Sequence, residues 1–489
     1  HSSRIVCTEL VGNKHTVNNN ELIALSASEV RRQLDRGDLS PLDVFNAVAE
    51  RIAAVNPIVN ALPTLCLEAA HDRAAQLTKD QVPVAKRGAL WGLPLAVKDY
   101  NDLAGVKTTY GSPIFATNVP NISDATVAQL EAAGAIPVGK ANVPEWAGAH
   151  TFNPVFGHTL NPWNRNMSAG GSSGGSAVAL ATGMVFLATG NDLGGSLRVP
   201  ASFNGVVGLR PSPGRVPRGQ RLPSFDTLWV EGPMGRCVED VALMLDGGAG
   251  QHPDDPLSFD SPHRSFREQL GDTGLPKRVA FSPDLGAVPM EPEIATICAN
   301  AAQRFTELGA DVHSVSPDFS GVIDAFQTLR AHLFAGMMEP LLQTHRKLIA
   351  PEIIWNIEKG LALSAANVRD AERVRTRITQ QMATFFEQYD LLLCPTVSVP
   401  PFPRELRYVE EIAGQATDTY IDWIAITFAI TMTGCPALSL PVGVTASGLP
   451  VGLQVIGRAR GEGDLLRACH HMESIFDLTS HVPIHPQAD

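Results

Sequence analysis

The first strongly periodic segment of the chain lies near its N-terminus. Residues 45–52 place apolar side chains at positions i, i+3, i+4 and i+7, which predicts one buried helical face. Ser40 and Pro41 suit the N-cap and first turn of this helix, and Pro57 is expected to end it. A capping box at 26–29 predicts a shorter helix just before it.

Two later segments, 123–138 and 293–315, share one pattern. In each, a helical run stops at a glycine, Gly134 or Gly309, and a short apolar run follows. Glycine after a helix is a common left-handed cap, and repeated helix–glycine–strand units are typical of α/β folds. Two further buried strands are expected at 92–97 and 390–394.

One long stretch without a charged residue covers 166–191. Its first half is rich in glycine and serine, and its apolar part, 177–188, is too short to cross a bilayer. We therefore expect a buried helix over 177–188 and no membrane span. The N-terminal residues lack a charged-then-apolar signal pattern, which favours a cytoplasmic location.

Composition narrows the possible functions. The 489 residues are 44% hydrophobic and only 18% charged, as in a large globular protein, and their length alone suggests about three domains. A net charge of −12 argues against nucleic acid or an anionic membrane as the main partner. The seven cysteines are scattered without metal-ligand spacing, so we expect free thiols in a reducing compartment and no metal site.

Glycine is concentrated in one region: twelve of the 42 glycines fall within 170–219. The motif 170–176, GGSSGGS, can approach a ligand closely and leads into a helix whose first N–H groups are free. It lacks the Lys of a P-loop and the spacing of a dinucleotide site. It does contain G-x-S-x-G around Ser173, so a Ser–His–Asp esterase using His470 or His471 stays open as an alternative.

A second glycine motif covers 191–200, where Ser196 directly follows two glycines. Adjacent backbone N–H groups at this position could stabilise an oxyanion beside the serine hydroxyl. Upstream, Lys98 ends the apolar run 92–97, and a lysine at the end of a buried strand is either paired or functional because an isolated buried ammonium is costly.

Together these motifs strongly resemble the amidase signature family. The similarity runs from about residue 20 to about residue 475. The matching segments, in chain order, are 92–99, 139–145, 161–163, 170–176, 192–200, 205–212, 394–396, 434–441 and 448–457. Two positions depart from the usual pattern: Asn191 stands where the family has Thr, and Arg210 stands where Lys is common.

The resemblance implies a Ser–cisSer–Lys triad. Ser196 would be the nucleophile, Ser172 would follow a cis peptide bond and relay the proton, and Lys98 would be the base. Lysine can accept a proton only when neutral, so burial must lower its pKa. Further roles are expected for the oxyanion-hole amides of Leu193, Gly194 and Gly195, the supporting residues Asp192, Arg198 and Ser173, and the pocket residues Trp146, His150, Phe152 and Trp355.

The resemblance also implies a fold and an activity. The fold is α/β, with a large mixed twisted β-sheet covered by α-helices on both faces. It would form one domain over 21–489, with an N-terminal extension over 1–20 and a surface loop near 247–262. The activity would be hydrolysis of a small-molecule amide, aryl amide or carbamate (urethane) through an acyl-enzyme, without a cofactor, by a monomer or homodimer. The alternative within the family is the A-type component of a tRNA-dependent amidotransferase.

Overall fold

The computed structural model describes residues 18–146, 148–219, 223–477 and 479–487. Most of the N-terminal extension expected over 1–20, together with Cys7, lies outside these residues. The last part of that range already belongs to the fold, because the side chain of Asn18 caps helix α1 (Asn19–Ala24).

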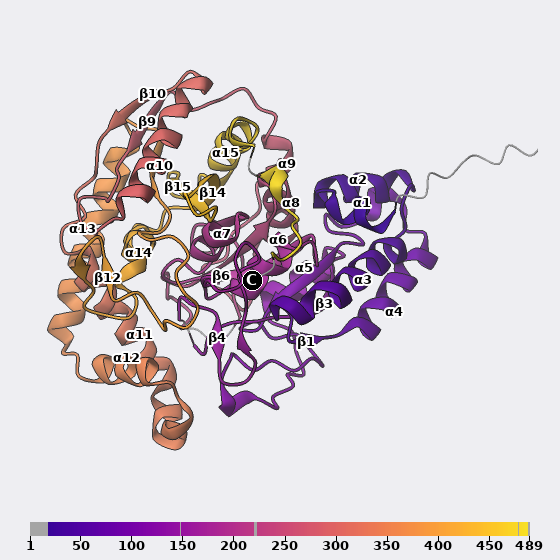
Figure 1. Cartoon of the computed structure of the whole chain (residues 1–489), viewed down its shortest axis with the longest axis horizontal. Coiled ribbons are helices and arrows are strands. Elements are labelled where there is room, and N and C mark those ends of the chain that lie inside the picture. The colour runs from indigo at the N-terminus through magenta and orange to yellow at the C-terminus, as the bar shows by residue number, and fades with distance from the viewer. Residues whose placement is uncertain (1–17, 147, 220–222, 478, 488–489) are drawn as a thin grey trace, which may run out of the picture.

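An 11-stranded mixed sheet forms the centre of the molecule (Figure 1). Its strands pair in parallel near both edges, whereas the middle of the sheet is antiparallel. This arrangement confirms the α/β class and the mixed sheet. In spatial order the strands are β1 (Thr64–Leu65), β3 (Ile136–Ala141), β2 (Pro94–Lys98), β6 (Leu187–Asp192), β8 (Val230–Gly235), β7 (Val207–Arg210), β14 (Ala437–Val444), β15 (Pro450–Ile456), β11 (Leu391–Pro395), β9 (Arg278–Phe281) and β10 (Asp311–Ser314).

Helices cover both faces of this sheet. Val207 and Leu209 of β7 point into an apolar cluster with α8 (Val238–Gly248), α10 (Pro292–Gln303) and α15 (Glu462–Phe476). A Cβ on the intervening Gly208 would instead meet α7 (Arg198–Asn204). The helices are α2 (Ala27–Arg36), α3 (Pro41–Val59), α4 (Leu67–Asp80), α5 (Ala125–Ala132), α6 (Gly174–Ala181), α7 (Arg198–Asn204), α8 (Val238–Gly248), α9 (Phe266–Gln269), α10 (Pro292–Gln303), α11 (Val322–His345), α12 (Pro351–Leu361), α13 (Ala365–Phe385), α14 (Ala425–Thr431) and α15 (Glu462–Phe476).

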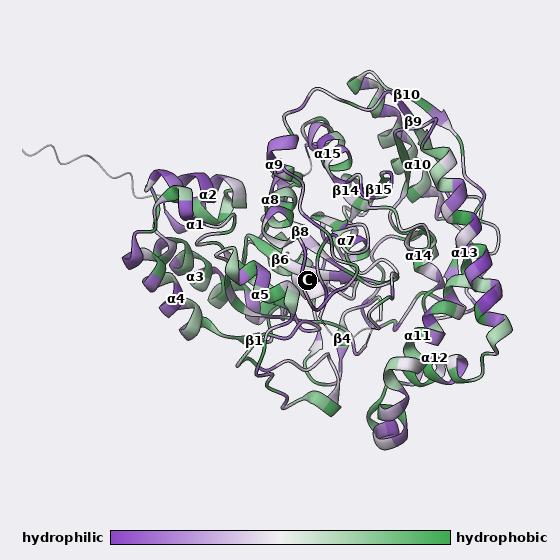
Figure 2. Ribbon diagram, turned by 180° about the vertical axis from the view of Figure 1, so that it is seen from behind, coloured by the Kyte–Doolittle hydropathy of each residue, from purple (hydrophilic) through white to green (hydrophobic). Residues whose placement is uncertain are grey.

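Helices α1–α4 lie at one end of the molecule and α11–α13 at the other (Figure 1). The outer helices carry both hydrophilic and hydrophobic residues along their length, as Figure 2 shows for α13. Two small hairpins stand apart from the main sheet: β4 (Phe152–Asn153) with β5 (Gly157–His158), and β12 (Glu411–Ile412) with β13 (Gln415–Ala416).

The N-terminal helices begin where the sequence predicts. Ser26 accepts a hydrogen bond from the backbone of Glu29, and Ser40 forms a capping box at the start of α3. The expected end of α3 at Pro57 is wrong, because the helix continues to Val59. Proline removes only one backbone donor in this last turn, and Asn60 then closes the helix in the left-handed conformation with φ 52°.

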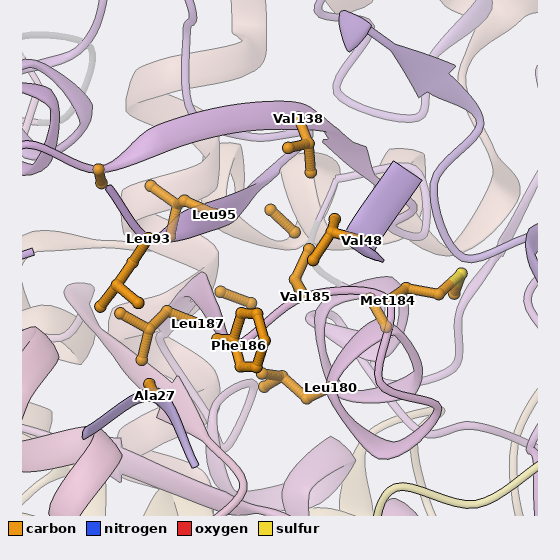
Figure 3. Packing of buried hydrophobic residues seen from close by; sticks show 14 of the residues in the cluster. Ala27, Val48, Leu93, Leu95, Val138, Leu180, Met184, Val185, Phe186 and Leu187 are labelled. Carbon is orange, nitrogen blue, oxygen red and sulfur yellow. The ribbon is translucent and has the colours of Figure 1, made fainter. Parts of the chain in front are cut away.

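The helix expected over 177–188 is also shorter than predicted. Helix α6 begins at Gly174 and ends at Ala181, after which Gly183 turns the chain with φ 73° and β6 follows. Phe186 and Leu187 pack with Leu180 in the core, so the whole stretch is buried (Figure 3). Of the helices that the structure describes, none has the length and apolar character needed to span a bilayer.

Both helix–glycine–strand units are present. Helix α5 is followed by Gly134 with φ 96° and then by β3, and α10 is followed by a 3-10 turn, Gly309 with φ 83° and β10. The expected strands near 92–97 and 390–394 are β2 and β11. Strand β2 pairs in parallel with β6, so Lys98 at the end of β2 lies next to the strand that carries Asn191.

Candidate active site

Lys98 is fully buried at the end of β2. Its Nζ donates hydrogen bonds to Ser172 Oγ and Ser173 Oγ, both at 2.7 Å, and to Asn191 Oδ1 at 2.6 Å. Within the described residues, no carboxylate lies within ion-pair distance of this ammonium. Burial lowers the pKa of Lys98 well below its ordinary value, against the more distant attraction of Glu231 and Asp192.

Ser172 and Ser173 belong to the glycine-rich turn that leads into α6. The peptide bond between Gly171 and Ser172 is cis, as the resemblance implies. The neighbouring glycines are required by close packing: a Cβ at Gly175 would lie 2.3 Å from the backbone N of Asn142, and one at Gly174 would lie 2.2 Å from Thr151 Oγ1. The turn therefore holds both serine hydroxyls against Lys98.

Two neighbours of Lys98 come from β6. The backbone N–H of Lys98 donates to Thr189 Oγ1 at 2.8 Å, and Asn191 accepts from the ammonium. The sequence marked Asn191 only as a departure from the family pattern, whereas the structure gives it a direct contact with Lys98. Glu231 of β8 is the cross-strand partner of Asn191. The sequence did not indicate Glu231, because no local motif surrounds it.

Ser196 lies on the turn between β6 and α7 and is partly exposed, in contrast to its buried neighbours. The backbone N–H of Ser173 donates to the carbonyl of Ser196 at 3.3 Å, so the two glycine motifs are in direct contact. In the described part of the chain, the Ser196 hydroxyl has no hydrogen bond to Ser172 or Lys98. The structure thus places all three residues at one site and joins only Ser172 to Lys98 directly.

Asp192 organises the turn that carries Ser196. Its carboxylate accepts hydrogen bonds from the N–H of Leu197 at 3.1 Å and from the guanidinium of Arg198 at 2.8 and 3.0 Å. Burial alone would raise the pKa of Asp192, but the guanidinium groups of Arg198 and Arg210 hold it well below its usual range. Asp192 and Arg198 therefore support the turn from behind.

The expected oxyanion hole needs one correction. The N–H of Gly195 donates to Asp192 Oδ1 at 2.9 Å, so this amide is already engaged and is not available to a substrate oxygen. Within the described residues, no hydrogen bond occupies the N–H groups of Leu193, Gly194 or Ser196. Asp192 thus binds one of the three amides that the family resemblance assigned to the oxyanion hole, and this bond tightens the turn.

The larger of two neighbouring cavities has a volume of about 490 Å³. His150 and Phe152 line it, together with Ile353 of α12 and Trp423. The backbone of His150 packs against the serine turn, because a Cβ at Gly171 would lie 3.1 Å from the backbone N of His150. Burial lowers the pKa of His150 to about 4, and this neutral ring accepts from the Ser168 hydroxyl at 2.7 Å.

A smaller cavity has a volume of about 190 Å³. Trp146 lines it, together with Tyr100, whose ring centroid is 4.8 Å from Lys98 Nζ. Trp355 lines neither of these cavities. It is 40% exposed on α12 and borders a separate surface hollow near Tyr420, because the outer face of that helix points to solvent.

The remaining candidates have structural surroundings. Lys140 is buried 3.5 Å from Asp99 and donates to Thr108 Oγ1, so it stabilises the loop after β2. The esterase alternative lacks support: Ser173 bonds to Lys98, no strand leads into its turn, and His470 lies on α15 beside Glu473. Within the described residues, no three His, Cys, Asp or Glu side chains are grouped so as to hold a metal ion.

Known proteins are similar to this chain in sequence and in fold. The Amidase family model matches residues 43–466. An acylamidase from Rhodococcus erythropolis is 34% identical, with 92% of this chain and 95% of the relative covered. The A-type component of the glutamyl-tRNA(Gln) amidotransferase from Moorella thermoacetica is 35% identical, with 93% and 97% covered.

A solved structure of a bacterial aryl acylamidase superposes with a TM-score of 0.86 at 27% identity, covering 94% of this chain and 99% of that one. That acylamidase is one of the amidase signature enzymes. The fold, the order of motifs and the family match all lead to the same group. The chain belongs to the amidase signature family and is an enzyme of the amide C–N hydrolase class.

Proposed function

We propose that the protein is a serine hydrolase that cleaves amide-type C–N bonds through an acyl-enzyme. Ser196 is the nucleophile, Ser172 relays its proton, and Lys98 is the base. The observation that carries the proposal is the bond of 2.7 Å between Ser172 Oγ and a fully buried Lys98 whose pKa is lowered by that burial. A neutral lysine held against a serine hydroxyl is an activating base.

The reaction then follows two proton transfers. Lys98 takes the proton of Ser172 as Ser172 takes the proton of Ser196, and Ser196 Oγ attacks the amide carbonyl carbon. The free N–H groups of Leu193 and Gly194 stabilise the negative oxygen of the tetrahedral intermediate. The same relay returns the proton to the departing amine, and water attacks the resulting ester with the relay acting as base again.

The substrate class follows from the walls of the larger cavity and from the relatives. Phe152, Ile353 and Trp423 make that cavity predominantly apolar, which suits an aryl or alkyl substituent. The Rhodococcus relative is an acylamidase and the solved neighbour is an aryl acylamidase. We therefore assign small acyl amides and aryl acylamides as substrates, with carbamates as the next members of the series.

The alternative function is that of an amidotransferase component. The Moorella relative favours it, because that protein is as similar to this chain as the acylamidase is. The purified chain alone should hydrolyse members of a panel of aryl amides, primary amides, carbamates and esters. Ser196→Ala should abolish this hydrolysis while leaving the circular dichroism spectrum unchanged. Failure on every panel member would favour the amidotransferase function, and full activity of Ser196→Ala would contradict the assignment of the nucleophile.

A further inference from the structure

The walls of the smaller cavity carry both aromatic rings and carboxyl groups, which is unusual for a site that receives only apolar groups. Four aromatic residues, Tyr100, Tyr110, Trp146 and Trp229, line one side of it. The rings are in mutual contact: Tyr100 and Trp229 have centroids 6.1 Å apart, and Tyr110 stacks on Trp146 at 5.1 Å. Aromatic faces grouped in this way attract cations through their quadrupoles.

Two carboxyl groups line the same cavity. Glu231 of β8 is only 4% exposed, and Asp124 precedes α5. Each oxygen of Glu231 accepts one hydrogen bond at 3.0 Å, from Asn101 and from the indole of Trp229, which leaves acceptor capacity on both.

Neither carboxyl group has a counter-ion within ion-pair distance among the described residues. Of the nearby cations, Lys140 pairs with Asp99 and Arg218 pairs with Asp226. Lys98, whose pKa is lowered by burial, attracts Glu231 from beyond ion-pair distance. Burial raises the pKa of Asp124 to about 7, and burial likewise raises the pKa of Glu231. Among the described residues, the cavity thus combines aromatic faces with acidic groups that have no ion-pair partner.

The cavity also has a definite position relative to the proposed base. Tyr100 is shared by the cavity wall and the surroundings of Lys98 Nζ, and Glu231 is the cross-strand partner of Asn191, which accepts from Lys98. At about 190 Å³ the cavity is smaller than the ~300–1,000 Å³ typical of sites for whole ligands. It therefore suits one substituent of a substrate whose amide lies at Ser196.

We propose that this cavity is a subsite for a cationic amino group, a protonated or quaternary ammonium, carried by the substrate. The inference rests on the proposed amide hydrolysis and adds a substrate class to it. A bound ammonium group favours the ionised form of Glu231, which then supplies the charge. The rings of Tyr100, Trp146 and Trp229 supply the faces, and Phe334 and Met338 of α11 close the opposite wall.

The first test uses two anilide substrates that differ only at one substituent, trimethylammonium in one and tert-butyl in the other. We expect the ratio of their kcat/KM values to favour the cationic substrate by about tenfold or more, in line with about 1–2 kcal/mol for a desolvated cation–π site. Glu231→Gln should bring this ratio close to one. The effect of that substitution on Lys98 is common to both substrates and cancels in the ratio.

Glu131→Gln is the matched control, because Glu131 is a half-buried glutamate on α5 that lines neither cavity. Its ratio should equal that of the unchanged protein. A ratio near one in the unchanged protein, or an unchanged preference in Glu231→Gln, would overturn the inference.

The second test does not depend on turnover. Choline and the neutral alcohol with carbon in place of its quaternary nitrogen are titrated into Ser196→Ala, with binding followed by tryptophan fluorescence. Choline should bind, the neutral alcohol should bind at least tenfold more weakly, and Glu231→Gln should remove the difference. Choline binding without hydrolysis of any amide would preserve the cation site and refute the proposed function. Amide hydrolysis without a preference for choline would refute the cation site and leave the proposed function intact.

Discussion

At the scale of single residues, the proposed base is created by its surroundings rather than by a charged partner. Lys98 is fully buried, and its closest polar contacts are two hydroxyls and an amide oxygen, none of which carries a charge. Such surroundings penalise the ammonium form while offering hydrogen bonds to the neutral amine. Burial also lowers the pKa of Lys140, but there the carboxylate of Asp99, 3.5 Å away, opposes the shift.

The lowered pKa of Lys98 predicts the pH dependence of the rate. Below that pKa the side chain is protonated and cannot accept a proton, so kcat/KM should fall as the pH decreases through it. The rising limb should have an apparent pKa well below the ~10.4 of an exposed lysine. A pH–rate profile measured with an uncharged aryl amide checks this, and a rate that rises only near pH 10 would contradict it.

Exchanging each buried lysine for methionine should separate catalysis from stability. Lys98→Met should lower kcat/KM by about 10²–10⁴-fold or more. Its loss of stability should be smaller than that of Lys140→Met, because no ion pair is broken and removal of the buried amine offsets part of the lost hydrogen bonds to Ser172, Ser173 and Asn191. Lys140→Met should destabilise the fold by about 3–5 kcal/mol, since it leaves Asp99 buried without its partner. Urea unfolding curves and kcat/KM values measure both effects. A large loss of stability in Lys98→Met with an unchanged rate would refute the assignment.

The sequence predicts some residues of the site and not others. Lys98, Ser172 and Ser196 stand in motifs, so their proximity can be predicted. Glu231 has no motif, because its place beside Lys98 arises from strand pairing between β8 and β6. The engagement of the Gly195 amide by Asp192 also depends on a turn geometry that the residue pattern does not specify.

At the scale of elements, the serine turn is fixed by close packing between α6 and β3. A Cβ on Gly175 would meet backbone atoms of Asn142 at 2.3 Å and of Ala61 at 2.6 Å. Backbone atoms cannot move aside as a flexible side chain can, so this contact fixes the position of the helix start and of the hydroxyls before it.

Two glycine-to-alanine substitutions in helices test this packing. Gly175→Ala should destabilise the protein by about 1–3 kcal/mol or more and reduce activity, because α6 must shift away from β3. Gly336→Ala, within α11, has no neighbour within 4 Å of the new Cβ and should stabilise the protein by up to about 1 kcal/mol. Thermal unfolding of both variants provides the comparison, and equal effects would show that the contact is unimportant.

Among the elements, the helices whose ends are marked by capping residues are predicted best. Ser26, Ser40, Gly134 and Gly309 mark helix ends correctly because side-chain caps and left-handed glycines act locally. The helix expected over 177–188 is wrong in its second half because a uniformly apolar run suits a buried helix and a buried strand equally. Only its position in the centre of the sheet makes 187–192 a strand.

At the scale of the whole molecule, the site is assembled from segments far apart in the chain. Trp146 and His150, in the loop after β3, face α11 and α12 across the two cavities. The helices of this far wall lie at the end of the molecule opposite α1–α4 (Figure 1). The sequence motifs predict Lys98, Ser172 and Ser196. The cavity wall formed by α11 and α12 follows from long-range packing and carries no comparable sequence signal.

The core of the whole molecule also determines thiol reactivity. Cys298, Cys394, Cys435 and Cys469 are buried, and burial raises the pKa of each, to about 12 for Cys394 and about 11 for Cys435. Of the seven cysteines, these four should react with a disulfide reagent only on unfolding, so at most three (seven minus four) react rapidly in the native protein. More than three fast thiols would contradict the packing.

The central claim concerns the nucleophile, and a trapped acyl-enzyme tests it most directly. An aryl ester whose acyl group leaves slowly is mixed with the protein, the reaction is quenched in acid, and the modified residue is located by peptide mass spectrometry. The account predicts one acyl group on Ser196, absent from Ser196→Ala and strongly reduced in Lys98→Met. An acyl group on Ser173, or labelling that persists in Ser196→Ala, would contradict it.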